Sequence, residues 1–284
     1  MSASNLGLPR PSAPTGSSEP DNTSSVLSSR VAALQWWHHI ELAKGIVTPG
    51  ILNKAHQDWV TDNLPARFDG LSVLDVGAWD GYYSFLVEER GARRVLAIDN
   101  LQNSDAHRSG TAPFELARAA RGSKVEYRVH DITKDGGINE AFDCVLFLGV
   151  YYHLPDPWVA LAAIRRLLSP RGFVLLEGLL LPGRKSIMRF FHSPELEETT
   201  SCAATERGLA FLARACGFDT AETVARHAGL GSVPFALWRY LPPKMKAGGG
   251  LSDRSITARL LRRSRLSDGA WPRILLRLRP RPNP

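Results

Sequence analysis

Residues 73–85 read VLDVGAWDGYYSF, an apolar run that ends at Gly77 and passes into a helical pattern. This order predicts a buried strand, a glycine turn and then a helix over 82–92. In a doubly wound fold, ligands bind outside the carboxyl ends of the strands, and glycines in the first turn let the backbone approach them closely. The dinucleotide fingerprint G-x-G-x-x-G would need a glycine where Trp79 stands. The stretch therefore predicts a nucleotide-like ligand without a pyrophosphate clamp.

Strand-like and helix-like segments alternate from residue 71 to about residue 178. Further strands are expected at 94–100, 125–131, 142–150 and 172–178, with helices at 114–122 and 158–170, the second stopped by Pro170. Strands separated by helices imply right-handed crossovers and a sheet covered on both faces. A helix over 204–218 and strands at 218–227 and 233–241 follow. The sequence predicts a doubly wound α/β fold whose mainly parallel seven-stranded, Rossmann-like sheet ends in an antiparallel hairpin.

The remaining segments divide the chain into further regions. Residues 1–30 are rich in Ser, Pro, Asn and Gly and bury too little apolar surface to fold, which predicts a disordered leader. Residues 31–70 are expected to form an N-terminal helical cap, with Leu34, Trp37 and Ile40 on one face of its first helix and a second helix over 51–64. Residues 71–243 then form the α/β domain, and residues 244–284 a basic C-terminal tail.

The net charge of +7 comes from one end of the chain. Residues 244–284 carry eleven Lys and Arg against two acidic residues, which leaves the other residues slightly acidic. The body therefore gives no reason to expect an electropositive nucleic-acid cleft. The tail itself fits three readings: a solvated appendage, a contact with RNA phosphates, or an attachment to an anionic membrane.

Composition also excludes some classes of protein. The longest apolar runs fall well short of the roughly 18 residues that a membrane span needs. The three cysteines, Cys144, Cys202 and Cys216, are odd in number and lack any metal-binding spacing, and no signal-peptide pattern opens the chain. We expect a cytoplasmic protein without a metal site and leave its oligomeric state open.

Two acidic residues extend the pattern that begins at Asp75. Asp99 ends the second predicted strand and Asp131 the third, where the first can accept hydrogen bonds from ribose hydroxyls and the second from an adenine amine. An adenosine moiety without phosphate indicates S-adenosylmethionine. The alternatives are that Asp75 caps its loop, that Gly77 and Gly81 are plain turn residues, and that Asp99 and Asp131 are solvated strand ends.

From about Trp37 to Tyr240 the chain resembles the class I S-adenosylmethionine-dependent methyltransferases. The motifs VLDVGAWDGYYSF, VLAIDN, VHDI and FDCVLFLGVYYHL carry this resemblance. Within the class, WHHIELAKGIVTPG and GVYYHLPDPWVAL are similar to the tRNA wobble-uridine carboxymethyltransferases. The resemblance implies a cofactor site made of Asp75, Gly77, Ala78, Trp79, Gly81, Asp99, Asn100, Asp131, Ile132, Leu148 and Tyr152, with Tyr152 at the methionine end.

The chain departs from the tRNA enzymes in ways that bear on its cofactor. We expect it to be shorter at the N-terminus, where those enzymes carry a longer helical extension. Only Lys44, Lys54 and Arg184 are candidate cations for the carboxylate of their carboxylated cofactor. Ordinary methyl transfer is therefore expected. The predicted acceptor is a small molecule methylated on oxygen or nitrogen, in specialised metabolism; the alternatives are a tRNA wobble base and a non-catalytic cofactor-binding protein.

Methyl transfer needs a base only where the acceptor still holds its proton. His153 follows the fourth predicted strand in Tyr151-Tyr152-His153, so we expect His153 and Tyr152 to be the catalytic residues. His153 could instead be a loop residue bonded to backbone, and Tyr152 a packing aromatic. Glu177 could orient an acceptor or bond a neighbouring loop. Four further residues are predicted to cover the substrate or to pack in the core: Trp36, Trp37, His38 and His39.

Overall fold

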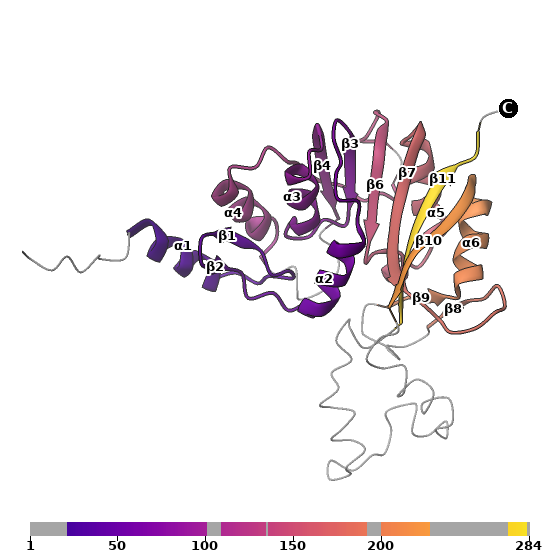
Figure 1. Ribbon diagram of the computed structural model, residues 1–284, viewed down its shortest axis with the longest axis horizontal. Coiled ribbons are helices and arrows are strands. Elements are labelled where there is room, and N and C mark those ends of the chain that lie inside the picture. The colour runs from indigo at the N-terminus through magenta and orange to yellow at the C-terminus, as the bar shows by residue number, and fades with distance from the viewer. Residues whose placement is uncertain (1–21, 101–108, 135, 192–199, 228–271, 283–284) are drawn as a thin grey trace, which may run out of the picture.

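A seven-stranded sheet forms the centre of the molecule (Figure 1). The computed structural model describes residues 22–100, 109–134, 136–191, 200–227 and 272–282. The sheet order is β10-β11-β7-β6-β3-β4-β5, and β11 runs antiparallel to both its neighbours while the pairs among β7, β6, β3, β4 and β5 are parallel. The strands are β3 (Ser72–Val76), β4 (Arg94–Asp99), β5 (Glu126–Val129), β6 (Phe142–Leu148), β7 (Leu168–Leu179), β10 (Phe218–His227) and β11 (Arg273–Pro280). The predicted doubly wound fold is confirmed.

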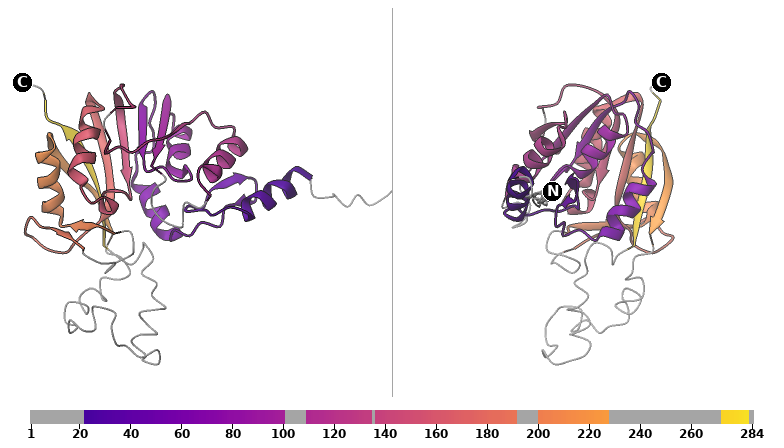
Figure 2. Two further views of the ribbon diagram at one scale, coloured as in Figure 1. Left: turned by 180° about the vertical axis from the view of Figure 1, so that it is seen from behind. Right: turned by 60° about the vertical axis from the view of Figure 1, so that its left-hand side comes forward.

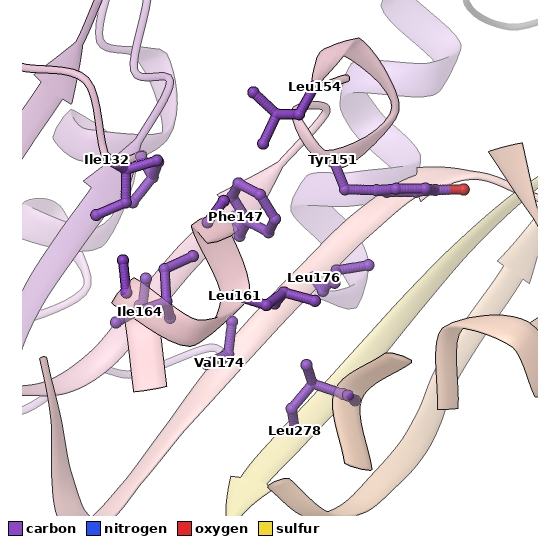
Figure 3. Close-up of a cluster of buried hydrophobic side chains, with 14 of the residues drawn as sticks. Ile132, Phe147, Tyr151, Leu154, Leu161, Ile164, Val174, Leu176 and Leu278 are labelled. Atoms are coloured by element: carbon purple, nitrogen blue, oxygen red, sulfur yellow. The ribbon is translucent and has the colours of Figure 1, made fainter. Parts of the chain in front are cut away.

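Helices cover the two faces of this sheet (Figure 2). Val73 and Leu74 are neighbours on β3, yet each is fully buried in a different apolar cluster, as expected of a strand with two covered faces. One cluster takes residues from α2 (Lys54–Asn63), α3 (Tyr82–Glu89) and α4 (Ala112–Arg121). The other takes them from α5 (Pro157–Arg166) and α6 (Glu206–Ala215). Figure 3 shows Leu161 and Ile164 of α5 among side chains of β6 and β7.

Two short hairpins lie outside the main sheet. β1 (Glu41–Ala43) pairs with β2 (Ile46–Val47), and β8 (Met188–Phe190) pairs with β9 (Cys202–Ala204). Within the described residues, no helix has the length and apolar character that a membrane crossing requires.

The first predicted helix of the N-terminal cap does not form. The chain instead has α1 (Asn22–Ala32), which begins inside the predicted leader, followed by an irregular segment and the β1–β2 hairpin. The backbone N–H groups of Trp37 and His38 donate to the buried carboxylate of Asp80, so they are not available to a helix. The second predicted helix is confirmed as α2. Of the predicted leader, residues 1–21 lie outside the described part of the chain.

The C-terminal hairpin uses a different second strand from the one predicted. Residues 218–227 form β10, but the predicted partner at 233–241 lies outside the described residues. The observed partner is β11, from the predicted tail, which inserts between β10 and β7 and buries Ile274, Leu276 and Leu278. The last part of the basic segment is therefore a strand of the central sheet.

The boundary between helix α5 and strand β7 lies earlier in the chain than predicted. The helix ends at Arg166 and the strand begins at Leu168, so that Pro170 lies in the strand and does not stop the helix. The pairing of β6 with β7 is irregular between Phe142 and Cys144, and Pro170 is exposed opposite this irregularity. A proline is tolerated there because no regular ladder bond requires its missing N–H.

Candidate functional site

A cavity with about 1260 Å³ of empty space, its open mouth included, lies at the carboxyl ends of the parallel strands. Ten of the predicted site residues line it: Asp75, Gly77, Trp79, Asp99, Asn100, Asp131, Ile132, Leu148, Tyr152 and His153. Ala78 and Gly81 are not in the wall; Ala78 is buried, and Gly81 caps the start of α3.

The turn after β3 can only be made with glycine. Gly77 has φ +79°, and a Cβ atom built on it would lie 2.5 Å from Cγ2 of Val150, a side chain in the cavity wall. Gly81 has φ +88°, and its Cβ would lie 2.6 Å from the ring of Phe114. Both positions therefore need the backbone freedom and the small size of glycine. A side chain at position 77 would therefore displace Val150 in the cavity wall.

The strand-end carboxylates hold the loops and also face the cavity. Asp99 Oδ2 accepts a hydrogen bond of 2.9 Å from the Trp79 N–H, which ties the end of β4 to the glycine turn. Asp131 Oδ1 accepts from the N–H and the hydroxyl of Thr133 at 2.9 and 2.7 Å. The alternative considered for both residues was a solvated strand end; instead they bond the neighbouring loops and also line the cavity, as ligand binding needs. An adenosine group, which offers ribose hydroxyls and an amine as donors, fits this set of acceptors.

Asp75 is a buried acid in the same wall. Burial raises the pKa of its carboxyl to about 6, against the opposing effect of a hydrogen bond from Ser84. The Ser84 hydroxyl donates to Asp75 Oδ2 at 2.6 Å.

The N-terminal segment enters the site through a contact that the sequence did not predict. The Asp80 carboxylate is fully buried and accepts three hydrogen bonds, two of 2.8 Å from the N–H groups of Trp37 and His38 and one of 2.5 Å from His38 Nδ1. The indole of Trp37 packs on that of Trp79, with centroids 5.0 Å apart, and both line the cavity. Trp36, in contrast, is a core residue whose Nε1 donates to the carbonyl of Val31.

A buried ion pair forms another part of the wall. The guanidinium of Arg273 on β11 holds both oxygens of Glu177 on β7, at 2.7 and 3.3 Å, and His56 Nε2 of α2 lies 3.4 Å from Glu177 Oε1. Burial disfavours the charge of Glu177, but Arg273 and His56 outweigh it and lower its pKa to about 2. The cations proposed from the sequence, Lys44, Lys54 and Arg184, are exposed and are not in the cavity wall. Arg273 was missed because its strand was taken for part of a tail.

The predicted catalytic pair lies beside this ion pair. Arg273 Nη2 donates to the Tyr152 hydroxyl at 3.1 Å and its guanidinium lies 5.0 Å from the Tyr152 ring centroid. The His153 ring lies against Tyr152, with centroids 4.2 Å apart, and the Ser201 hydroxyl donates to the His153 carbonyl. Tyr152 is buried and bonded to Arg273, whereas His153 is half-buried and lines the cavity.

A family model described as "Methyltransferase domain" matches residues 50–223, more than half of the chain. The chain belongs to this methyltransferase-domain family. Membership confirms the predicted class, an S-adenosylmethionine-dependent methyltransferase, and its cofactor. It also agrees with the glycine turn and the strand-end carboxylates, which fit an adenosyl group.

Individual relatives differ in what they act on. A tRNA U34 carboxymethyltransferase of Nautilia profundicola is 32% identical over 126 residues, 43% of this methyltransferase and 38% of the relative. A ubiquinone biosynthesis O-methyltransferase of Cereibacter sphaeroides is 26% identical over 169 residues, 56% of this chain and 64% of the relative. The chain thus spans less than two thirds of the length of either relative.

Solved structures share the fold of this methyltransferase. The N-terminal domain of EvdMO1, determined in the presence of SAH and D-fucose, matches with a TM-score of 0.57 and 17% identity, covering 92% of this chain and 98% of that one. The [4+2]-cyclase SpnF matches with a TM-score of 0.54 and 19% identity, covering 90% and 92%. At these identities the likeness concerns the fold alone.

Proposed function

We propose that this protein transfers a methyl group from S-adenosylmethionine to an oxygen or nitrogen of a small molecule, such as a specialised metabolite. The observation that carries the proposal is that the strand-end carboxylates and His153 line the same cavity. Part of its wall comes from the N-terminal segment, through Trp37, His38, Leu52 and His56, and this segment would cover a small acceptor.

The cofactor supplies a methyl group on a sulfonium, which is already an activated leaving group. The residues of this chain then act mainly by positioning. Asp99 and Asp131 would hold the adenosine group by accepting hydrogen bonds, while Ile132 and Leu148 offer apolar surface in the same wall. The imidazole of His153 would take the proton of an acceptor hydroxyl or ammonium group. Tyr152, fixed by Arg273, would keep the His153 ring in place.

Asp99→Ala tests the cofactor site. The variant is expected to bind S-adenosylhomocysteine roughly 10- to 100-fold more weakly, because hydrogen bonds to a charged carboxylate are lost. Calorimetric titration measures the effect, and Asp58→Ala, which removes an exposed acid paired with Lys54, is the control. Equal affinity of the Asp99 variant and the natural protein would refute the assignment.

His153→Gln tests the proposed base. We expect kcat for methyl transfer to fall at least tenfold, with the affinity for S-adenosylhomocysteine unchanged, because the amide keeps the size of the ring but cannot take a proton at neutral pH. Steady-state kinetics with the accepted substrate, alongside calorimetry, separates the two quantities. An unchanged kcat would leave His153 as a loop residue.

A tRNA acceptor is the second candidate, favoured by the similarity to the tRNA U34 enzymes and by the basic segment after residue 243. A radiolabelled methyl donor offered with small molecules and with tRNA in parallel discriminates the two. Replacing Arg259, Arg262, Arg263 and Arg265 by Gln is the suitable control, since deleting the whole segment would also remove β11. Label in RNA that disappears with these arginines or with added salt would favour tRNA.

We also propose a cytoplasmic location. The three cysteines are free thiols, and burial raises the pKa of Cys202 to about 12. Protein without a disulfide suits a reducing compartment.

A further inference from the structure

His38 lines the cavity, and aromatic side chains hold its imidazole. The residue is 5% exposed, lines the cavity, and stacks on the Tyr82 ring, with centroids 5.4 Å apart. The edge of Tyr83 packs against it at 5.1 Å. Because aromatic rings hold it on two sides, the imidazole has one orientation relative to the cavity.

Asp80 determines which nitrogen of this ring is available. Its carboxylate accepts hydrogen bonds from the backbone N–H groups of Trp37 and His38 and from His38 Nδ1, so Nδ1 carries a proton. In the neutral imidazole the other nitrogen, Nε2, is then a hydrogen-bond acceptor. Asp80 is not in the cavity wall, and no described residue bonds Nε2, so the ring edge turned to the cavity is the one that can accept.

Asp75 adds a second acceptor to the same cavity wall. Asp75 is bonded to Ser84 of α3, and the His38 ring packs on the two residues that precede Ser84, so the two groups lie close together. Asp75 accepts from Ser84, and no Lys or Arg of the described residues forms an ion pair with it. Glu177, in contrast, already has Arg273. A buried carboxylate is stable when a cation with hydrogen-bond donors lies against it. The part of the cavity beside Asp75 and His38 therefore suits an ammonium group.

We propose that His38, oriented by Asp80, is a positioning residue that binds the ammonium group of the methionine part of the cofactor, accepting its hydrogen bond at Nε2 beside Asp75. This rests on the proposed cofactor site and adds the N-terminal segment to it. Asp80 acts through His38 and through the two backbone N–H groups that hold the segment in place.

Three thioether ligands test the assignment by calorimetry. S-adenosylhomocysteine carries an ammonium and a carboxylate, decarboxylated S-adenosylhomocysteine carries the ammonium alone, and methylthioadenosine carries neither. His38→Asn keeps a donor for Asp80 near the position of Nδ1 but removes Nε2. The variant is expected to bind the first two ligands about tenfold more weakly, which is about 1.4 kcal/mol, and methylthioadenosine as well as the natural protein does.

His39→Asn is the matched control, because His39 Nε2 bonds the carbonyl of Leu52 and the residue is not in the cavity wall. Its affinities should not change. Weaker binding of S-adenosylhomocysteine alone would place His38 at the carboxylate and overturn the proposal. Equal weakening of all three ligands would reduce His38 to a packing role and would overturn it too. Failure of the natural protein to bind any of them would refute the cofactor site itself.

Discussion

Gly77→Ala is expected to weaken the binding of S-adenosylhomocysteine more than 100-fold. The φ angle of +79° alone costs an L-residue about 1–2 kcal/mol. The new Cβ would also lie 2.5 Å from Val150 Cγ2, so Val150 must shift within the cavity wall. The substitution therefore changes the turn and the cavity wall together. Calorimetric titration of the folded variant measures the loss.

Two further variants separate the contact from the backbone strain. Gly70→Ala imposes a similar φ of +70° where nothing lies within 4 Å, so it should lower stability and leave cofactor affinity intact. Adding Val150→Ala to Gly77→Ala removes the colliding methyl group and should restore much of the binding. Wild-type affinity in Gly77→Ala would show that the turn does not adjoin the ligand.

The predictions from the sequence were most accurate where residues close together in the chain determine the structure. The run 73–85 contains a strand, a turn with two required glycines and a helix start within thirteen residues, and all three occur as predicted. Asp99 and Asp131 were found for a related reason, since the carboxyl ends of parallel strands share one edge of the sheet.

Long-range pairings explain what was missed. Residues 31–43 have a helical pattern, but Asp80, more than forty residues away, takes two of the N–H groups such a helix would use. Arg273 lies 96 residues from Glu177, in a segment where arginines alternate with leucines. That alternation fits a strand, yet the net charge suggested a solvated tail. Only the position of β11 between β7 and β10 makes Arg273 part of the site.

Arg273→Met is expected to lower the free energy of unfolding by about 3–5 kcal/mol, because it leaves the Glu177 carboxylate buried without its main partner. Both residues are 2% exposed, so water cannot replace the guanidinium. Denaturant unfolding at neutral pH measures the loss. Arg226→Met is the matched control: its pair with Glu206 lies at the surface, where ion pairs contribute no more than about 1 kcal/mol.

The pH dependence identifies the charge as the cause. In the natural protein Arg273 and His56 lower the pKa of Glu177 to about 2 from an ordinary 4.5. The charged Glu177 therefore stabilises the folded state above pH 4.5, and this contribution is lost as the pH falls through 2. Without Arg273, burial raises that pKa, and the folded variant gains a proton on acidification. The difference in free energy of unfolding between Arg273→Met and the natural protein should therefore become smaller as the pH falls from about 7 to about 5.

The double variant Arg273→Met, Glu177→Met has no buried charge at this pair and should be more stable than Arg273→Met at neutral pH. A deficit independent of pH, or no recovery in the double variant, would mean that β11 is held by its apolar side chains alone.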